Sequence, residues 1–218
     1  MSRAIRRAAV MILATASIAG AQSTDQTLDR AITAWGKVKT ARATFEQTVT
    51  NSLTGSSATA RGEYQQQRPN RVAIRFTDPA GDRIVADGAS VWVYLPSSAP
   101  GQVVKRSASD GPALPLDITG EFLTDPRGRY DISSAGSGTV GGHSAKALLL
   151  SPKPQTQAPF TRATIWVDDD DALIRQFEVV EPSGVTRRIR ITSLDLNVPV
   201  DKSTFSFTPP AGVRVVER

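Results

Sequence analysis

Two features of the sequence carry residue types that could do chemistry: the only histidine, His143, and a run of four aspartates from Asp168 to Asp171. A histidine that acts as a general base needs an oriented partner and a nucleophile nearby. Gly141 and Gly142 directly precede His143, which is typical of a structural residue at a tight hairpin turn. The aspartate run lacks the glycine and the distal glutamate of an EF-hand loop. Because it lies between apolar stretches, it predicts a solvated hairpin turn rather than a calcium site.

Other reaction centres and cofactor sites are not indicated. The chain has no cysteine, which excludes disulfides, thiolate metal sites, a cysteine nucleophile and attachment of a lipid to cysteine. The glycine-rich stretch GSGTVGG does not lead into a helix, so it does not match a phosphate-binding loop. No paired carboxylates stand out. We therefore expect a protein that is not an enzyme and has no catalytic residues, no metal and no cofactor.

The first 21 residues have the pattern of a secretory signal peptide. Three arginines precede an apolar run over residues 8–18, and Ala19-Gly20-Ala21 is a cleavage pattern of small residues. The run is about half of the ~20 residues that span a bilayer, which disfavours the alternative of an uncleaved anchor. Cleavage would lower the formal charge from +5 to 5 − 3 = +2, so we expect no nucleic-acid partner. Residues 22–218 are expected to form a single domain.

The segment Asp25–Lys39 is the clearest predicted helix, because its apolar residues recur at spacings of three and four. From Thr40 the apolar residues alternate with a period of two, and turn sequences separate such strands. Residues 107–125, rich in proline and glycine, interrupt them and predict one or two short helices. The expected fold is mainly β: a strongly curved antiparallel sheet of about eleven strands, with two or three helices over its open mouth or concave face.

One predicted strand is apolar on both faces. In VWVYLP, Trp92 and Tyr94 alternate with Val91, Val93 and Leu95. We interpret one face as the lining of an internal cavity and the other as packed beneath a helix or loop. A core filled by the chain's own side chains is the alternative. A curved sheet that is covered by helices and lacks catalytic groups favours a carrier for an apolar ligand.

Several motifs, in their order along the chain, resemble the LolA family of periplasmic outer-membrane lipoprotein carriers. They are ATFEQTVT after the amphipathic helix, RPN at Arg68–Asn70, DG at Asp87–Gly88 followed by VWVYLP, and FSFTPPAGV at Phe205–Val213. The resemblance implies an unclosed β-barrel, or half-barrel, with a helical lid over a hydrophobic cavity that takes the acyl chains of lipoproteins. It also implies a periplasmic monomer that receives lipoproteins from an inner-membrane LolCDE-type ABC transporter and passes them to an outer-membrane receptor of the LolB type or an equivalent.

The resemblance assigns a role to Arg68. In the family, the arginine of the RP motif hydrogen-bonds backbone carbonyls of the lid and holds the empty cavity shut, and Arg68 is the matching residue. An ordinary surface charge at a strand end is the alternative. The chain departs from better-studied members at Val72 and Ile74, where those proteins have aromatic residues.

Candidate ligand-binding residues fall into two groups, and a register error of one residue would exchange the faces of a whole strand. The candidate cavity-lining residues are Phe45, Val49, Ile74, Phe76, Val91, Val93, Leu149, Ile165 and Phe177. The candidate lid residues are Leu28, Ile32, Trp35, Leu114, Leu116, Ile118 and Phe122. The alternative function is a related envelope module that senses lipid or lipoprotein in stress signalling. A secreted hydrolase that uses His143 is a more distant alternative.

Overall fold

Twelve hydrogen-bonded strands form the body of this computed structural model, which describes residues 15–108 and 117–217, with the backbone alone at residues 15–22 and at Ile118. The helices are α1 (Thr15–Gly36), α2 (Ile118–Leu123), α3 (Pro126–Arg129) and the 3₁₀ helix η1 (Lys202–Phe205). The strands are β1 (Thr40–Asn51), β2 (Ser57–Gln67), β3 (Arg71–Asp78), β4 (Ala80–Asp87), β5 (Ser90–Tyr94), β6 (Gln102–Ser107), β7 (Tyr130–Val140), β8 (His143–Pro152), β9 (Arg162–Asp168), β10 (Ile174–Val180), β11 (Val185–Leu196) and β12 (Arg214–Glu217).

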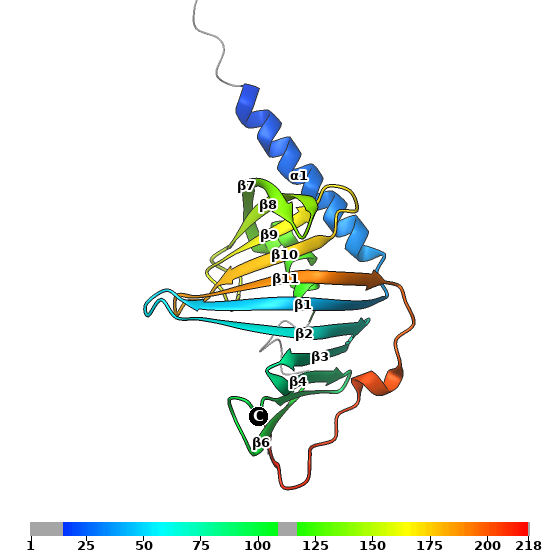
Figure 1. Cartoon of the computed structure of the whole chain (residues 1–218). Coiled ribbons are helices and arrows are strands. Elements are labelled where there is room, and N and C mark those ends of the chain that lie inside the picture. Colours follow the sequence, from blue (N-terminus) through cyan, green and yellow to red (C-terminus); the bar gives the residue numbers. More distant parts are fainter. Residues whose placement is uncertain (1–14, 109–116, 218) are drawn as a thin grey trace, which may run out of the picture.

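The strands follow the order β12-β6-β5-β4-β3-β2-β1-β11-β10-β9-β8-β7. Strands β1 and β11 are far apart in the sequence and join the two halves of the sheet at its centre (Figure 1). Neighbouring strands are antiparallel, except that β12 runs parallel to β6. The edge strands β12 and β7 do not pair with each other, so the sheet stays open. This confirms the predicted unclosed antiparallel half-barrel, and the described part has twelve strands where about eleven were expected.

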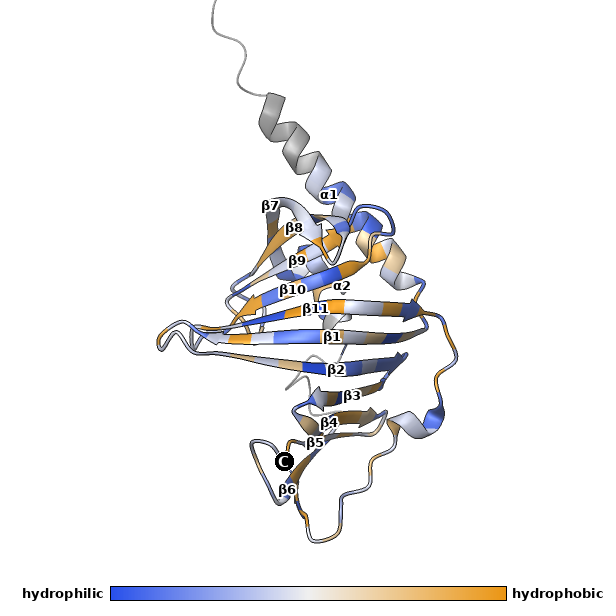
Figure 2. Cartoon of the chain, viewed as in Figure 1, coloured by the Kyte–Doolittle hydropathy of each residue, from blue (hydrophilic) through white to orange (hydrophobic). Residues whose placement is uncertain are grey.

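The inner face of the sheet is apolar because side chains alternate between the two faces of each strand. In β1, Ala41, Ala43 and Phe45 are buried, whereas the residues between Ala41 and Phe45 on the other face are exposed. Figure 2 shows hydrophobic and hydrophilic residues mixed along the same strands, as this alternation requires. The buried inner side chains of β1, β3 and β8–β11 form one hydrophobic cluster.

Helices α1 and α2 cover this inner face. Leu28, Ala31 and Trp35 of α1 are at most 6% exposed and belong to the same cluster as Phe122 and Leu123 of α2. Leu28, Ala31 and Trp35 belong to the predicted apolar stripe of the amphipathic helix, which docks on the concave side. Helix α1 begins N-terminal to the predicted cleavage position after Ala21 and ends at Gly36.

The C-terminal segment covers part of the outer face. It leaves β11, forms η1 against β3 and β4, and runs on to β12 (Figure 1). The Phe207 ring lies 5.7 Å from the ring of Trp92 and 5.8 Å from that of Tyr94. Strand β5 is therefore apolar on both faces because a loop covers its outer side. The sequence pattern predicts a short strand around Phe205 and Phe207, but residues 202–205 form η1, whose cap Asp201 accepts from the Ser203 N–H.

The helices can be compared with the length and apolarity that a membrane-spanning helix needs. Within residues 15–108 and 117–217, no helix is both long enough and apolar enough to cross a bilayer.

Candidate ligand cavity

An apolar cavity of about 390 Å³ lies between the inner face of the sheet and the helices. This volume falls in the range of roughly 300–1,000 Å³ that is typical of small-molecule sites. Most lining side chains are aliphatic or aromatic and come from strands on both sides of β1. They include Trp35, Ala41, Ala43, Phe45, Tyr64, Ile74, Phe76, Ile84, Val93, Leu95, Phe122, Phe160, Leu173, Ile174, Phe177, Val179, Ile189, Ile191 and Leu194.

The few polar groups in the lining mostly have partners of their own. Glu181 accepts from Arg187 at 3.2 Å. Glu121 accepts from the Tyr130 hydroxyl at 3.0 Å and forms a close ion pair with Arg129. Among the fully buried polar atoms of the lining, the exception is the Trp35 indole, whose Nε1–H has no hydrogen-bond acceptor among the described residues. An unpaired buried donor costs free energy that a ligand carbonyl could recover.

Five of the nine predicted cavity residues lie in the lining: Phe45, Ile74, Phe76, Val93 and Phe177. The Phe45 and Phe76 rings meet edge to face at a centroid distance of 5.7 Å. Ile74 is buried, so this departure from the aromatic residue of better-studied members still leaves an apolar side chain on the inner face. The strand alternation in β1, β3, β5 and β10 was thus sufficient to place these side chains.

The other four predicted cavity residues lie elsewhere. Leu148 and Leu150 pair in register with the buried Ile165 and Ala163, so Leu149 between them faces the outer side, which corrects its predicted position. Ile165 is fully buried on the inner face but belongs to the packed core rather than to the cavity lining.

The remaining two lie on the predicted face but at the wrong position along the strand. Val49 pairs with Arg187, which lines the cavity, but Val49 lies beyond the lining toward the β1–β2 hairpin. Val91 shares the face of Val93 and packs against the buried core instead. Alternation predicts the face of a side chain, whereas the extent of the cavity depends on the curvature of the sheet.

The predicted lid residues of α1 and α2 lie together over the inner face. Leu28, Trp35 and Phe122 are buried in the core cluster, and the half-buried Ile32 packs against it. Trp35 and Phe122 also line the cavity. Leu114 and Leu116 lie outside the described residues, and only the backbone of Ile118 is described, as the first residue of α2.

Arg68 connects the sheet to both helices. Its guanidinium donates to the Trp35 carbonyl at 3.0 Å, and its Cζ lies 4.8 Å from the centroid of the Trp35 ring. A second guanidinium nitrogen lies 3.7 Å from the Asp117 carboxylate. Asp117 caps α2 by accepting from the Gly120 N–H at 2.7 Å. One arginine at the end of β2 thus contacts the last turn of α1 and the first turn of α2.

The surroundings of Arg68 also affect Tyr64, which lines the cavity. Burial raises the pKa of the Tyr64 hydroxyl well above its usual value, the Asp117 carboxylate raises it further, and Arg68 opposes both. Tyr64 is therefore neutral over the range in which the protein would work. It contributes an uncharged aromatic wall to the cavity.

Arginines also fix the outer surface of α1. Arg127 pairs with Asp25 at 3.0 Å and with Asp29 at 2.8 Å, and hydrogen bonds to Asp29 and Asp25 raise the pKa of Arg127. Arg30 donates to the carbonyl of Asp169 at 2.8 Å. These contacts hold the N-terminal part of the lid, whereas Arg68 holds its C-terminal turn over the cavity.

The aspartate run is a hairpin turn, but it is not solvated throughout. Asp168 is only 2% exposed, and its carboxylate lies 2.7 Å from Arg175 Nε and 2.8 Å from His143 Nδ1. This corrects the prediction of a solvated turn at Asp168. Among the described residues, no three His, Cys, Asp or Glu side chains are grouped so that they could hold a metal ion. His143 is a strand-end residue that pairs with a structural carboxylate.

Many contributors to the site were not predicted, among them Phe160, Asp117 and Glu121. Phe160 lines the cavity from the β8–β9 connection, and its ring lies 5.9 Å from that of Phe122. No sequence pattern marks it, because it lies in an irregular loop. Asp117 could have been recognised as a helix cap, since an aspartate directly precedes ITGEFL. Glu121 lies in the same predicted helix, but only the structure shows that it pairs with Arg129 and Tyr130.

The open curved sheet and its helix-covered apolar cavity define a binding protein of the lidded half-barrel class. Residues 36–208 match the family described as Outer membrane lipoprotein carrier protein LolA, and the chain belongs to this family.

Full-length relatives carry the corresponding description. The chain is 26% identical over 223 residues to an outer-membrane lipoprotein carrier protein of Methylibium petroleiphilum, covering 97% of this chain and 99% of that one. It is 30% identical over 179 residues to the carrier protein of Serratia proteamaculans, covering 81% of each. The carrier protein of Xanthomonas campestris is 29% identical over 222 residues, covering 99% and 98%.

Solved structures share the fold at low sequence identity. An uncharacterized conserved protein from Thermus thermophilus superposes with a TM-score of 0.57 at 14% identity, covering 90% of this chain and 100% of that one. The structure of MucB gives a TM-score of 0.52 at 19% identity, covering 90% of this chain and 66% of MucB. At these identities the likeness shows the fold alone.

Proposed function

We propose that this protein is a soluble periplasmic carrier that holds the acyl chains of lipoproteins in its apolar cavity. The observation that carries the proposal is a cavity of about 390 Å³ whose helical cover is bound to the sheet through Arg68. Membership of the lipoprotein carrier family supports it. The signal-peptide pattern of residues 1–21 supports export to the periplasm.

Such a carrier needs a free-energy cost of binding that opposes the gain from burying the acyl chain. Burying one methylene contributes about 0.8 kcal/mol, so a long acyl chain represents on the order of 10 kcal/mol before any cost is subtracted. A carrier that retained all of this free energy would release its cargo too slowly. Breaking the contacts between Arg68, Trp35 and Asp117 when the lid opens would offset part of it.

Cargo transfer is proposed to run between the two membranes. Lipoproteins released by an inner-membrane ABC transporter of the LolCDE type would enter the cavity, and an outer-membrane receptor of the LolB type or an equivalent would accept them. The protein is proposed to act as a monomer that binds rather than to catalyse a reaction. The lining of the described cavity has no nucleophile with an adjacent base, and His143 is not part of it.

Release of a newly made lipoprotein from spheroplasts by purified residues 22–218 tests the proposal. Ala43→Phe should reduce release by filling the cavity, because Ala43 is a small buried lining residue. Thr44→Phe is the matched control, since Thr44 is adjacent to Ala43 in the sequence but exposed on the outer face. A folded wild-type protein that releases no lipoprotein, or an Ala43→Phe variant that releases it at the normal rate, would contradict the proposal.

A sensing role is the outcome that this experiment could reveal instead. Lipoprotein binding without transfer, together with recovery of a lasting complex with a regulator protein in a pull-down, would redirect the function to stress signalling. The fold likeness to MucB does not by itself favour that role, because it extends to the fold only.

A further inference from the structure

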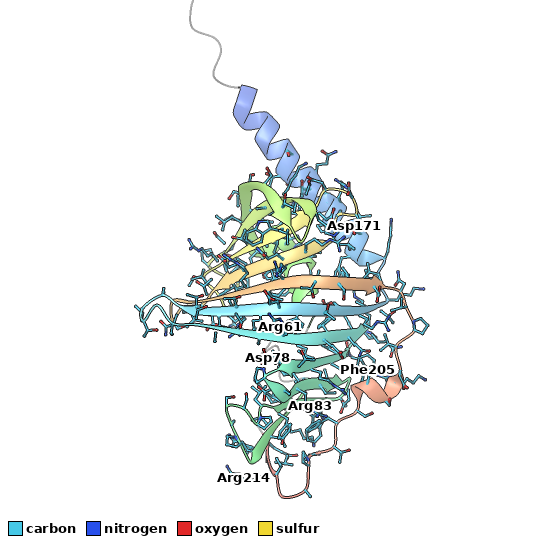
Figure 3. The ribbon with its side chains drawn as sticks, in the orientation of Figure 1. Arg61, Asp78, Arg83, Asp171, Phe205 and Arg214 are labelled. Atoms are coloured by element: carbon cyan, nitrogen blue, oxygen red, sulfur yellow. The ribbon has the colours of Figure 1, made fainter. Side chains whose placement is uncertain are left out.

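A second cavity, of about 230 Å³, lies on the outer face of the sheet beneath the C-terminal segment. Its charged lining residues are Glu63, Arg75 and Arg83 from β2, β3 and β4, and η1 and the residue after it add the hydroxyls of Thr204 and Ser206. Figure 3 shows Arg83 beside the segment that carries Phe205. The cavity is several times larger than the roughly 30 Å³ that one water occupies in the liquid.

Within the described part of the chain, the two arginines of this cavity have no acidic partner. Arg75 and Arg83 lie directly opposite each other in the β3–β4 register. Like charges in directly opposite positions destabilise a sheet. No acidic group of the described residues lies within 4.0 Å of either guanidinium, although Glu63 lies opposite Arg75 in the β2–β3 register. With two guanidinium groups and one carboxylate, the cavity has a net formal charge of 2 − 1 = +1.

Its hydrogen-bond donors are also unused. Arg83 Nε is buried and has no acceptor among the described residues, although the guanidinium is held in place 5.9 Å from the centroid of the Phe207 ring. The hydroxyls of the half-buried Thr204 and the exposed Ser206 also have no hydrogen-bond partner in residues 15–108 and 117–217. A buried donor without an acceptor in a polar cavity points to an ion or to water that completes it.

We propose that this outer cavity binds the phosphate group of a small anion or of a lipid headgroup. Guanidinium groups donate in a fork that matches phosphate oxygens, and two of them would be neutralised at once. The hydroxyls of Thr204 and Ser206 supply further donors on the opposite wall. The site is on the opposite face from the acyl-chain cavity, because Arg75 alternates with Ile74 and Phe76 along β3, and Ile74 is the one residue that both linings share.

Titration calorimetry with inorganic phosphate and with glycerol 3-phosphate at low ionic strength tests the site. Arg75→Gln and Arg83→Gln should each weaken binding by about tenfold or more, and Glu63→Gln should strengthen it about threefold by removing a like charge. Arg61→Gln is the matched control: Arg61 lies on the same face, outside the cavity, and pairs with Glu46 at 3.3 Å and Asp78 at 4.0 Å (Figure 3).

The opposite signs of these effects make the experiment decisive. The absence of saturable phosphate binding by the folded wild type would overturn the proposal, and so would equal weakening by the Arg61 and Arg83 variants. Arg83→Lys retains the charge and should retain part of the affinity, which separates loss of the site from misfolding. Binding of a fluorescent fatty acid should stay unchanged in all these variants, so failure of this inference and failure of the proposed carrier function are distinguishable.

Flotation with vesicles separates the two sources of phosphate. Binding to phosphatidylglycerol vesicles that free phosphate competes away, and that Arg83→Gln abolishes, would support a lipid headgroup as the ligand. Calorimetric binding of glycerol 3-phosphate without vesicle binding would support a free phosphate ester. Vesicle binding that is insensitive both to phosphate and to the Arg83 substitution would contradict a headgroup site here.

Discussion

The guanidinium of Arg68 donates to the Trp35 carbonyl at 3.0 Å and lies 4.8 Å from the centroid of the same residue's ring. Trp35 also lines the apolar cavity. The residue that would contact a ligand is therefore the residue that Arg68 holds. A ligand that displaces the end of α1 must break a charge-assisted hydrogen bond and a cation–π contact, which connects filling of the cavity to opening of its cover.

Arg68→Leu should retain cargo and pass it on slowly. A hydrogen bond to a charged group contributes about 1.5–3 kcal/mol, so its loss from the closed state should slow transfer to an acceptor by about tenfold or more. Arg71→Leu is the control, because among the described residues Arg71 bonds only the Gln67 side chain, at 3.4 Å. The rate of lipoprotein transfer to outer-membrane vesicles measures the effect. Normal transfer by the Arg68 variant would refute the proposed role of Arg68 in holding the lid closed.

Two substitutions of Asp117 distinguish its role as the cap of α2 from its ion pair with Arg68. Asp117→Asn should keep the cap of α2 and change transfer only a few-fold, because a partly exposed pair at 3.7 Å contributes about 0–1 kcal/mol. Asp117→Ala should remove the cap as well and destabilise α2 by about 1 kcal/mol. Hydrogen exchange of residues 119–123 distinguishes the two variants. Equal protection in both would show that Asp117 does not cap the helix in solution.

Trp35→Phe should change ligand preference more than stability. The substitution removes a buried Nε1–H that has no acceptor among the described residues, so it costs the free protein no hydrogen bond there. We expect affinity for a fatty-acid methyl ester to fall about two- to tenfold, while affinity for an alkane of the same length changes little. Competition with a fluorescent apolar probe measures both affinities.

Trp92→Phe is the matched control for this prediction. Trp92 lies on the outer face, where its Nε1 donates to Asp87 at 3.2 Å. Its loss should leave ester and alkane binding alike unchanged. An equal loss of ester and alkane affinity in the Trp35 variant would mean that the indole acts by filling space alone.

Gly62→Ala should disturb the cavity wall. A Cβ atom at Gly62 would lie 2.6 Å from the Arg75 carbonyl oxygen and 2.7 Å from Phe45 Cζ, so either the backbone or the ring must move. Overpacking of this kind costs about 1–3 kcal/mol. Gly138→Ala is the control, because none of the described residues lies within 4 Å of a Cβ there. Denaturant unfolding compares the two variants, and equal stabilities would contradict the close approach.

Much of this architecture follows from local patterns, and the exceptions have physical causes. The i, i+3, i+4 stripe predicts the covered face of α1, and Leu28 and Trp35 lie on it. The motif containing Arg68 pointed to contacts with lid carbonyls, and among the described residues the Arg68 side chain donates to the Trp35 carbonyl. In the continuous run Leu148–Leu149–Leu150, the sequence contains no alternation, so only strand pairing could decide which residue faces outward.

The sequence pattern also could not predict which charged side chains are buried or share a cavity. Four adjacent aspartates predict a solvated turn because unpaired charges avoid the interior, but the hairpin brings Arg175 to Asp168. The two arginines of the outer cavity have the pattern of ordinary solvent-facing residues of β3 and β4. Their shared cavity arises only when the C-terminal segment folds back across the sheet.

The carboxylate of Asp168 should make stability depend on acid. Burial raises the pKa of Asp168, but hydrogen bonds from the Asp170 N–H and from Arg175 more than offset it and hold the pKa below its usual value near 3.8. A depressed pKa means that the stabilisation is fully present above the unfolded-state pKa and is lost as the pH falls through the folded-state value. Asp168→Asn should therefore lower the free energy of unfolding at pH 7, and its difference from the wild type should shrink below about pH 4. Denaturant unfolding at a series of pH values measures this, with Asp131→Asn as an exposed control; a difference that is constant with pH would show that packing, not charge, explains the contribution of Asp168 to the turn.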